Sequence, residues 1–284
     1  MSDSTITDIR PSPEPVIYQP KQSAIEALKD VVRGAKRVNL WWALATEDLL
    51  QRYKRSAIGM LWILLSFGLF LSVKFAIFSV ILDVDVVDYL KYLATGYFLW
   101  IFIQRCLVDG CATFISSEGW IKGRKLPFSI FAFQMVTRNI LTALIQVLVV
   151  AVILVLGGTE WTPNALISLF IVVILYPINA FFISILFGVI TVRSRDFFYL
   201  VQSLNHIFLF LSPVLWQPEK MGALWDNLLV YNPIAHFLIS VRTPLIYGTI
   251  PWTSVFVVLG VTAALGILSM AALQFAYRRI VYWI

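Results

Sequence analysis

The stretch LLQRYKRSAIGMLWILL, residues 49–65, joins a cluster of cations to a long apolar segment. Arg52, Lys54 and Arg55 stand directly before residues 57–82, which are apolar over enough length to cross a bilayer, since about 20 residues suffice. Lys and Arg gather at the cytoplasmic ends of membrane helices. The stretch therefore predicts a membrane span that starts in the cytoplasm, and it leaves open whether the cluster also binds a substrate.

The composition of the whole chain is that of a membrane protein. Of its 284 residues, 60% are hydrophobic and 13% are charged, against about 25% charged residues in soluble domains. The net charge of +6 does not call for a nucleic acid partner, because cations in such chains mark cytoplasmic loops. Residues 1–38 begin with a polar, Pro-rich stretch that lacks the apolar core of a signal peptide, and we expect a flexible cytoplasmic tail there.

Six segments are long and apolar enough to span a bilayer. They cover residues 57–82, 89–115, 128–156, 165–192, 197–216 and 252–277. The third and the fifth are interrupted by Arg138 and His206. We predict an all-α polytopic membrane protein whose six transmembrane helices occupy residues 57–284.

The distribution of cations predicts the orientation of these spans. Sixteen Lys and Arg residues lie before the first span, in the loops after the second and fourth spans, and after the sixth. The opposite side holds Lys220 and Arg242, and its first loop is the acidic DVDVVD of residues 83–88. By the positive-inside rule, both termini are expected in the cytoplasm.

Residues 39–56 form a segment of a different kind. They begin NLWWALATEDLLQR, a loosely amphipathic pattern with two tryptophans, which favour the membrane interface. We predict an interfacial helix that lies along the cytoplasmic leaflet and leads into the first span.

The outer segment of residues 217–251 is too apolar for an ordinary loop. It holds two short apolar pieces, broken at Asn232-Pro233 and at Thr243-Pro244. Irregular backbone at membrane depth needs cover from protein or from a water-filled cavity. We predict a re-entrant helical hairpin, and the alternative is a pair of amphipathic helices on the outer surface.

The cytoplasmic loop SSEGWIKGRKLP, residues 116–127, has mixed charge and ends at a proline. Ser116 or Ser117 suits the N-cap of a short helix, which Pro127 would end. We interpret the loop as a docking element for a cytoplasmic partner, and the alternative is a positively charged connector.

Charged side chains inside spans are costly and therefore candidates for function. Arg138 lies about 15 Å into the third span, and we interpret it as lining a polar path, unless residues 128–133 are interfacial and it lies shallower. Arg105 and Asp109 are four residues apart and are expected to pair along their helix. His206 is expected to be a satisfied core histidine.

Several chemistries lack a sequence signal. The chain has no GxxxxGK[ST] phosphate loop, so we expect no ATP hydrolysis by this chain. No His/Cys cluster has metal-ligand spacing, so no metal site is expected. Cys106 and Cys111 fall on different helix faces and should stay reduced. Asp83 and Asp85 match the D-x-D pattern of glycosyltransferases, but on the outer side, away from sugar nucleotides.

Three passages give the chain a resemblance to a known family. They are LLQRYKRSAIGMLWILLS at residue 49, GWIKGRKLPFSIFAF at residue 119 and NPIAHFLISVRTPLIYG at residue 232. Their order and spacing resemble the permease subunits of type 2 ABC exporters that move O-antigen, capsule or teichoic acid. Phe67 stands where many members have proline, and the first 38 residues have no counterpart.

The resemblance implies a homodimer in the bacterial inner membrane, paired with two cytoplasmic ATPase subunits that bind ATP and Mg²⁺, so this chain would hold no cofactor. The substrate would be a lipid-linked polysaccharide, with membrane lipids around it. The implied sites are an entrance for the lipid pyrophosphate (Arg52, Tyr53, Lys54, Arg55), a channel (Trp62, Phe67, Phe70, Arg138, Phe198, Tyr199, Phe208) and an ATPase contact (Glu118, Trp120, Lys122, Arg124, Lys125). Export of drugs or small lipids, or a membrane glycosyl- or acyltransferase, are the alternatives.

Overall fold

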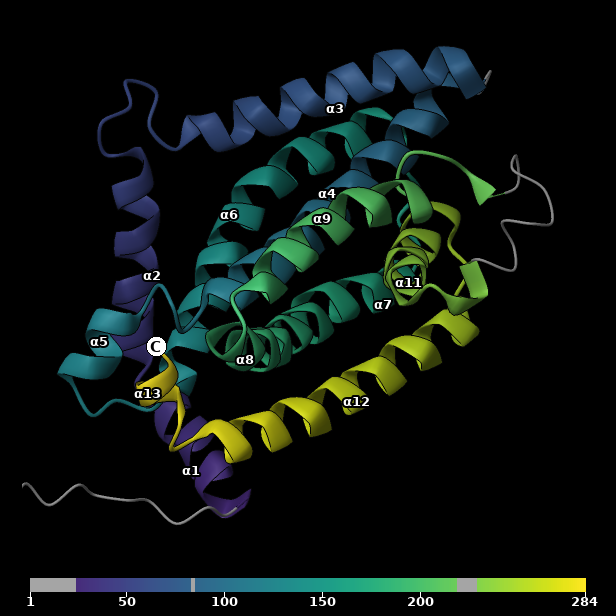
Figure 1. Cartoon of the computed structure of the whole chain (residues 1–284). Coiled ribbons are helices and arrows are strands. Elements are labelled where there is room, and N and C mark those ends of the chain that lie inside the picture. The colour runs from purple at the N-terminus through teal and green to yellow at the C-terminus, as the bar shows by residue number, and fades with distance from the viewer. Residues whose placement is uncertain (1–23, 83–84, 219–228) are drawn as a thin grey trace, which may run out of the picture.

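The computed structural model describes residues 24–82, 85–218 and 229–284, and every regular element in this part of the chain is a helix (Figure 1). The elements are α1 (Ala24–Ala35), α2 (Val38–Tyr53), α3 (Leu61–Leu82), α4 (Val86–Ala112), α5 (Glu118–Gly123), α6 (Ser129–Leu156), α7 (Ala165–Phe170), the π-helical η1 (Ile171–Leu175), α8 (Tyr176–Arg193), α9 (Asp196–Leu211), α11 (Pro233–Tyr247), α12 (Trp252–Ala276) and α13 (Ile280–Trp283). The all-α prediction is confirmed.

Among the described residues, five helices are long and apolar enough to cross a membrane: α3, α4, α6, the continuous α7–η1–α8 and α12. The fifth predicted span, residues 197–216, is helical only as α9, whose 16 residues rise about 24 Å, less than the hydrocarbon core of about 30 Å. The helix ends at Ser212, which is extended (φ −100°, ψ 150°) because a residue before proline, here Pro213, disfavours the helical region. The prediction was wrong for residues 212–216, and the count of six spans stays a prediction.

The long helices lie side by side, and the short elements gather at their ends (Figure 1). Helix α2 runs across one end of the bundle, where the interfacial helix was predicted, and α1, α5, α13 and the C-terminus lie at that same end. Helices α7 and α11 lie toward the opposite end. This arrangement gathers the basic segments at one end, as the orientation prediction requires.

The fourth long helix changes its winding midway, at η1. The amide of Tyr176 donates to the carbonyl of Ile171, five residues back, whereas an α-helix uses the carbonyl four residues back. Pro177 follows directly and has no amide to donate. The wider turn therefore stands where a proline would otherwise interrupt a regular helix, and α8 continues from it to Arg193.

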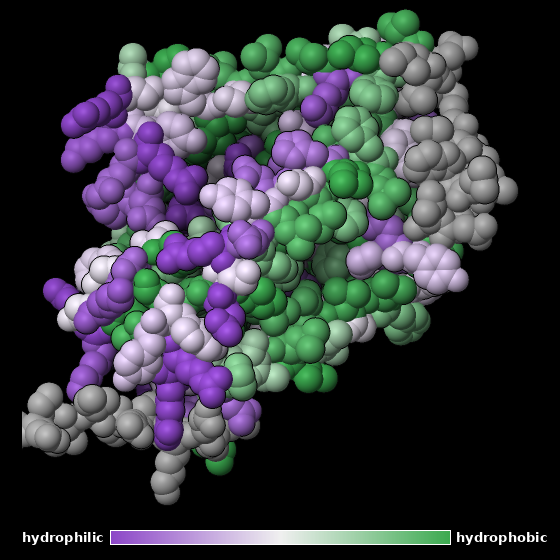
Figure 2. Space-filling view, in the orientation of Figure 1, coloured by the Kyte–Doolittle hydropathy of each residue, from purple (hydrophilic) through white to green (hydrophobic). Residues whose placement is uncertain are grey.

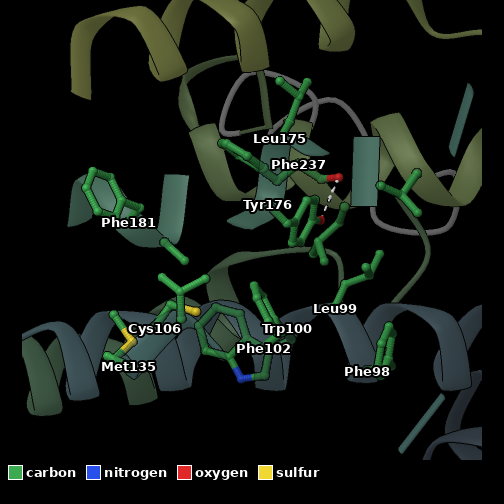
Figure 3. Close-up of a cluster of buried hydrophobic side chains, with 14 of the residues drawn as sticks. Phe98, Leu99, Trp100, Phe102, Cys106, Met135, Leu175, Tyr176, Phe181 and Phe237 are labelled. Atoms are coloured by element: carbon green, nitrogen blue, oxygen red, sulfur yellow. Dashed lines mark hydrogen bonds between the residues drawn. The ribbon is translucent and has the colours of Figure 1, made fainter. Parts of the chain in front are cut away.

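The core lies around α4, α8 and α11, and Figure 3 shows part of it. The ring of Tyr176 packs between Phe102 of α4, at a centroid distance of 5.9 Å, and Phe237 of α11, at 5.5 Å. The Tyr176 hydroxyl donates to the carbonyl of Phe237 over 3.1 Å. Cys106 and Met135 lie beside this stack, and Cys106 and Cys111 are both free thiols, as predicted.

Residues 24–35 correct the prediction of a flexible tail, whereas residues 1–23 lie outside the described part of the chain. Residues 24–35 form α1, which packs on α6 and α12. The buried carboxylate of Asp30 accepts hydrogen bonds from the amides of Phe128 and Ser129, at 3.0 and 2.9 Å. These amides open α6 and have no intrahelical partner, so Asp30 caps α6 from a distant part of the sequence.

Residues 219–228 of the predicted outer hairpin lie outside the described part of the chain. The description resumes at residue 229. The predicted break at Asn232 is present: its side chain accepts from the amides of Ile234 and Ala235 and begins α11. The predicted break at Pro244 is wrong, because α11 continues through it to Tyr247 and ends at Gly248, whose φ of +69° favours glycine. Packing against α4, α7 and α12 holds this helix despite the proline.

Arg242, which the sequence predicts on the outer side, is buried in α11 with 3% exposure. Its guanidinium lies 3.6 Å from the ring centre of Tyr92 and donates to the carbonyl of Pro213 over 2.8 Å. Gly96 of α4 leaves the space for it, because a Cβ there would lie 1.7 Å from Nη2 of Arg242. This contact ties α11 to α4 and to the turn after α9.

Candidate functional site

The turn between α2 and α3 redirects the chain from across the bundle to along it. The amide of Ser56 donates to the carbonyl of Tyr53 over 3.0 Å, and the amide of Leu61 to that of Ile58 over 3.3 Å. Between them Gly59 has a φ of +59°, a left-handed conformation that glycine adopts without strain. The turn leaves the preceding basic residues at the exposed corner of the molecule.

The residues of the predicted entrance line two different cavities. Arg52, Lys54 and Arg55 line an open cavity of about 550 Å³ together with Gln51 and Ser56. Tyr53 instead lines a second cavity, of about 570 Å³. The entrance residues that the resemblance implies thus fall on two neighbouring surfaces, with Tyr53 on the side of the larger one.

The larger cavity lies between α3, α4 and α9, with one residue from α6. Its aromatic wall is Trp62, Phe67 and Phe70 of α3, with Tyr97 opposite, and the rings of Phe67 and Tyr97 stack at 5.7 Å. Its amide-bearing residues are Gln104, Gln146, Gln202 and Asn205, and its titratable residues besides tyrosine are Arg105, Asp109 and His206. Figure 2 shows hydrophilic side chains reaching into the otherwise apolar middle of this face.

Asn205 stands out among these residues. It is 1% exposed, and neither its amide nitrogen nor its carbonyl oxygen has a hydrogen-bond partner in the described part of the chain. Buried polar groups are normally paired, since leaving one unpaired costs about 1–3 kcal/mol. Asn205 is therefore a buried polar side chain, unpaired among the described residues, in the wall of the cavity.

An ion-pair network lies beside the cavity and joins three helices. Arg138 of α6 approaches Asp109 of α4 at 3.0 Å and Asp48 of α2 at 3.3 Å. The side chain of Gln134 donates to the same oxygen of Asp48 over 2.6 Å. The network attaches α2 to the long helices. Because Arg138 has an acidic partner on each side, these attractions offset the cost of burying its charge.

The predicted pairing of Arg105 with Asp109 is wrong. Among the described residues Asp109 pairs with Arg138 from the neighbouring helix, and Arg105 donates to Gln146 over 3.4 Å. Both Arg105 and Asp109 face the cavity, so the spacing along α4 brings them to the same wall without joining them. Arg138, whose side chain is 13% exposed, supports that wall from behind.

The channel residues implied by the resemblance separate in the structure. Trp62, Phe67 and Phe70 meet in the larger cavity. On α9, Phe198 and Tyr199 contact each other at 5.5 Å and Tyr199 is exposed, and neither they nor Phe208 are among the cavity's lining residues. His206, expected in the core, is exposed and lines the cavity instead.

The sequence analysis did not predict that polar residues of α9 line a cavity, although the sequence contains a signal for it. Gln202, Asn205 and His206 are spaced i, i+3 and i+4, which places them on one helix face. Polar residues at that spacing in an apolar helix indicate a face turned toward protein or water rather than lipid. Gln104 and Gln146, in α4 and α6, carry the same kind of signal singly.

The predicted docking loop contains α5, which begins after Ser117. Glu118 and Lys122 form an ion pair at 2.7 Å, and this hydrogen-bonded pairing lowers the pKa of Glu118. The guanidinium of Arg124 lies 5.2 Å over the ring of Trp120, which is 40% exposed. Lys125 is exposed as well. The five residues thus form one exposed surface at the end of the bundle where α2 lies (Figure 1).

One aspartate of the D-x-D pattern, Asp85, caps a helix. Asp83 lies outside the described residues, and Asp85 accepts from the amides of Val87 and Asp88, both at 3.0 Å, as the N-cap of α4. Within the described residues no group of three or more His, Cys, Asp or Glu side chains is placed to hold a metal ion.

Comparison with known proteins identifies the class of membrane protein. The chain is similar to two proteins of Klebsiella pneumoniae named O-antigen export system permease protein RfbA, 25% and 26% identical over 207 residues, which are 73% of this chain and 80% of each relative. A protein of the same name from Myxococcus xanthus is 24% identical over 206 residues, 70% of this chain and 76% of the relative. The family model for the ABC-2 type transporter matches residues 39–246. The chain, with its bundle of apolar helices, therefore belongs to the ABC-2 type transporter family.

Proposed function

We propose that this chain is the membrane permease of an ATP-driven exporter that moves a lipid-linked polysaccharide across the bacterial inner membrane. The names of its relatives, which are O-antigen export permeases, support this assignment. It acts as a homodimer with two cytoplasmic ATPase subunits, and both termini lie in the cytoplasm. The ATPase binds ATP and Mg²⁺, and this chain carries out transport without a catalytic reaction of its own.

The observation that carries the proposal is the lining of the larger cavity. Sugars present hydroxyl groups at their edges and C–H groups on their faces. The amides of Gln104, Gln202 and Asn205 match the hydroxyls, and the rings of Trp62 and Phe70 match the faces. A cavity for an apolar drug would not need four amide side chains in a membrane helix bundle, because each costs free energy there unless it is paired.

The basic cluster is the entrance for the anionic end of the substrate. Arg52, Lys54 and Arg55 line an open cavity at the corner between α2 and α3. Cations near an anionic membrane surface contribute about 1 kcal/mol each, and a guanidinium matches the geometry of a phosphate with two hydrogen bonds. A lipid pyrophosphate would be held here while its sugars reach Tyr53 and the larger cavity.

The surface of α5 is the contact for the ATPase. Trp120 supplies an exposed ring, and Lys122, Arg124 and Lys125 supply charge around it. Aromatic and arginine side chains dominate the energetics of protein interfaces. The ion-pair network of Arg138 then connects the helices near α5 with α2, so that ATP binding is sensed at the entrance.

The test compares variants of the cavity in a strain from which the chain's own gene has been deleted. Export of surface polysaccharide is measured with the wild-type chain, with Trp62→Ala and with Leu69→Ala. Leu69 is the matched control, because it lies on the same helix, is 65% exposed and does not line the cavity. We expect Trp62→Ala to lower surface polysaccharide severalfold while Leu69→Ala leaves it unchanged at equal protein levels. Normal surface polysaccharide in the deletion strain itself would refute the proposal.

A further inference from the structure

Helix α1 carries an apolar stripe that the rest of the described chain leaves exposed. Ile25, Leu28 and Val32 are 61%, 61% and 46% exposed, and their spacing of three and four residues puts them on one face. Single exposed apolar residues are common on protein surfaces. Three in one row on a helix of twelve residues indicate a surface that is covered in the working protein.

The orientation of α1 is fixed, so the stripe cannot turn inward. Asp30 is fully buried, and besides the two α6 amides it accepts from the Tyr277 hydroxyl over 3.1 Å. The Ser129 hydroxyl donates to the backbone carbonyl of Asp30 over 2.8 Å. Gly34 approaches so closely that a Cβ would lie 2.1 Å from Oγ of Ser129. These contacts bind the face of α1 that lies away from the stripe.

Cations flank the stripe. Lys29, Arg33 and Lys36 follow one another at intervals of four and three residues along one side of it, and the one acidic residue on that side, Glu26, pairs with Lys29 at 3.1 Å. An apolar row beside a basic row is typical of helices that lie in a membrane interface and bind anionic lipids. A protein partner would need a matching acidic groove, whereas an anionic lipid surface supplies both properties at once.

The position of α1 agrees with a lipid surface. It packs against α12 at the end of the bundle where the C-terminus lies (Figure 1). The last turn of α12 exposes 57% of Phe275, and Arg279 lies 4.7 Å over that ring. An exposed ring covered by a cation at the end of a span is expected where hydrocarbon meets head groups. The stripe and Phe275 thus belong to two packed helices at the same end of the bundle.

We infer that α1 is a membrane-surface anchor, with Ile25, Leu28 and Val32 inserted into the cytoplasmic leaflet and Lys29, Arg33 and Lys36 on anionic lipid head groups. The ligand is the lipid surface itself, separate from any transported substrate. Helix α1 precedes residues 39–246, which the family model matches. The inference does not depend on which substrate the chain exports.

The test measures the membrane depth of single positions in the full chain. The native thiols Cys106 and Cys111 are buried, so a spin label is attached at Leu28→Cys or, as the matched control, at the neighbouring Lys29→Cys. Each labelled protein is reconstituted into vesicles of phosphatidylcholine, with or without phosphatidylglycerol. Collisions of the label with oxygen, which enriches in lipid, are compared with collisions with a water-soluble nickel chelate.

We expect the label at position 28 to collide with oxygen and severalfold less with nickel than the label at position 29. Replacing Arg33 and Lys36 by Gln should lower the ratio of immersed to water-exposed helix about fivefold for each cation removed, in the anionic vesicles only. Equal nickel access at both positions would place the stripe in water and overturn the inference. A label at position 28 shielded from both reagents would also overturn it, because a protein would then cover the stripe. Unchanged thermal unfolding of each variant ensures that the fold is intact.

Discussion

Replacing Gly96 by Ala tests the contact that ties α11 to α4. The added Cβ would lie 1.7 Å from Nη2 of Arg242 and 3.3 Å from the carbonyl oxygen of Val214. The guanidinium must therefore move, although it is 3% exposed and held by Tyr92 and Pro213. The perturbation is a single methyl group, and its cost is the set of contacts that Arg242 gives up.

The magnitude follows from those contacts. A desolvated cation over an aromatic ring contributes about 2 kcal/mol, and a hydrogen bond from a charged donor contributes about 1.5–3 kcal/mol. Ala favours a helix over Gly by about 1 kcal/mol, which offsets part of the loss. We expect the free energy of unfolding to fall by about 2.5–4 kcal/mol, or the melting temperature to fall by about 5–8 °C.

The assay is thermal unfolding of the full chain in detergent, followed by tryptophan fluorescence. Gly68→Ala is the matched control, because a Cβ there meets nothing within 4 Å. In a background of Arg242→Met the guanidinium is absent, and Gly96→Ala should then cost less than about 1 kcal/mol, because the two sites are coupled. Equal unfolding of Gly96→Ala and Gly68→Ala, or an undiminished cost in the Arg242→Met background, would refute the reasoning.

Three further predictions concern the cytoplasmic end. Burial raises the pKa of Asp30 above its ordinary 3.8, against the lowering effect of its hydrogen bonds, so the folded protein binds more protons than the unfolded chain just above pH 3.8. Its stability should therefore fall as pH rises through that window, and Asp30→Asn should remove this slope from the melting temperature measured against pH. Arg138→Met leaves Asp48 and Asp109 without their cation and should lower the free energy of unfolding by about 2 kcal/mol, less than for a fully buried pair because both are partly exposed; adding Asp109→Asn should restore part of the loss in the same unfolding assay. Trp120→Ala should reduce copurification of the ATPase without lowering the permease's own melting temperature, because the ring is 40% exposed; a parallel loss of stability would contradict a docking role.

The spans were largely predictable, because a continuous apolar run has one explanation in a chain of this composition. The exception, α9, shows the limit of hydropathy. Residues 212–216 remain mostly apolar after the helix has ended. The hydropathy of the segment therefore does not indicate the helix end that Pro213 imposes. The proline itself was the better signal, and at Pro244 the same signal was overridden by packing.

The parts that depend on contacts between distant residues were not predictable. Nothing in the pattern of α1 indicates that Asp30 meets amides about 100 positions away, and without that meeting a twelve-residue helix is marginal. Asp109 lies four residues after Arg105 on α4, but it pairs with Arg138 of α6 instead. The aromatic wall of α3 was found because its residues share one helix, whereas the cavity is defined only when α4 and α9 meet it.

The π-helical turn of η1 also sets how insertions and deletions are tolerated. A π turn is what remains when one residue is inserted into an α-helix, with the helix on each side intact. Removal of one residue from Ile171–Leu175 would restore regular winding and leave α7 and α8 in nearly the same relative orientation, whereas removal of one residue from within α8 would rotate the rest of α8 by about 100°. After a deletion in η1, Tyr176 would keep Phe102 and Phe237 as neighbours, and the core around α4 would stay packed. The η1 turn is therefore the place in the fourth long helix where the loss of one residue disturbs the packing of α8 least.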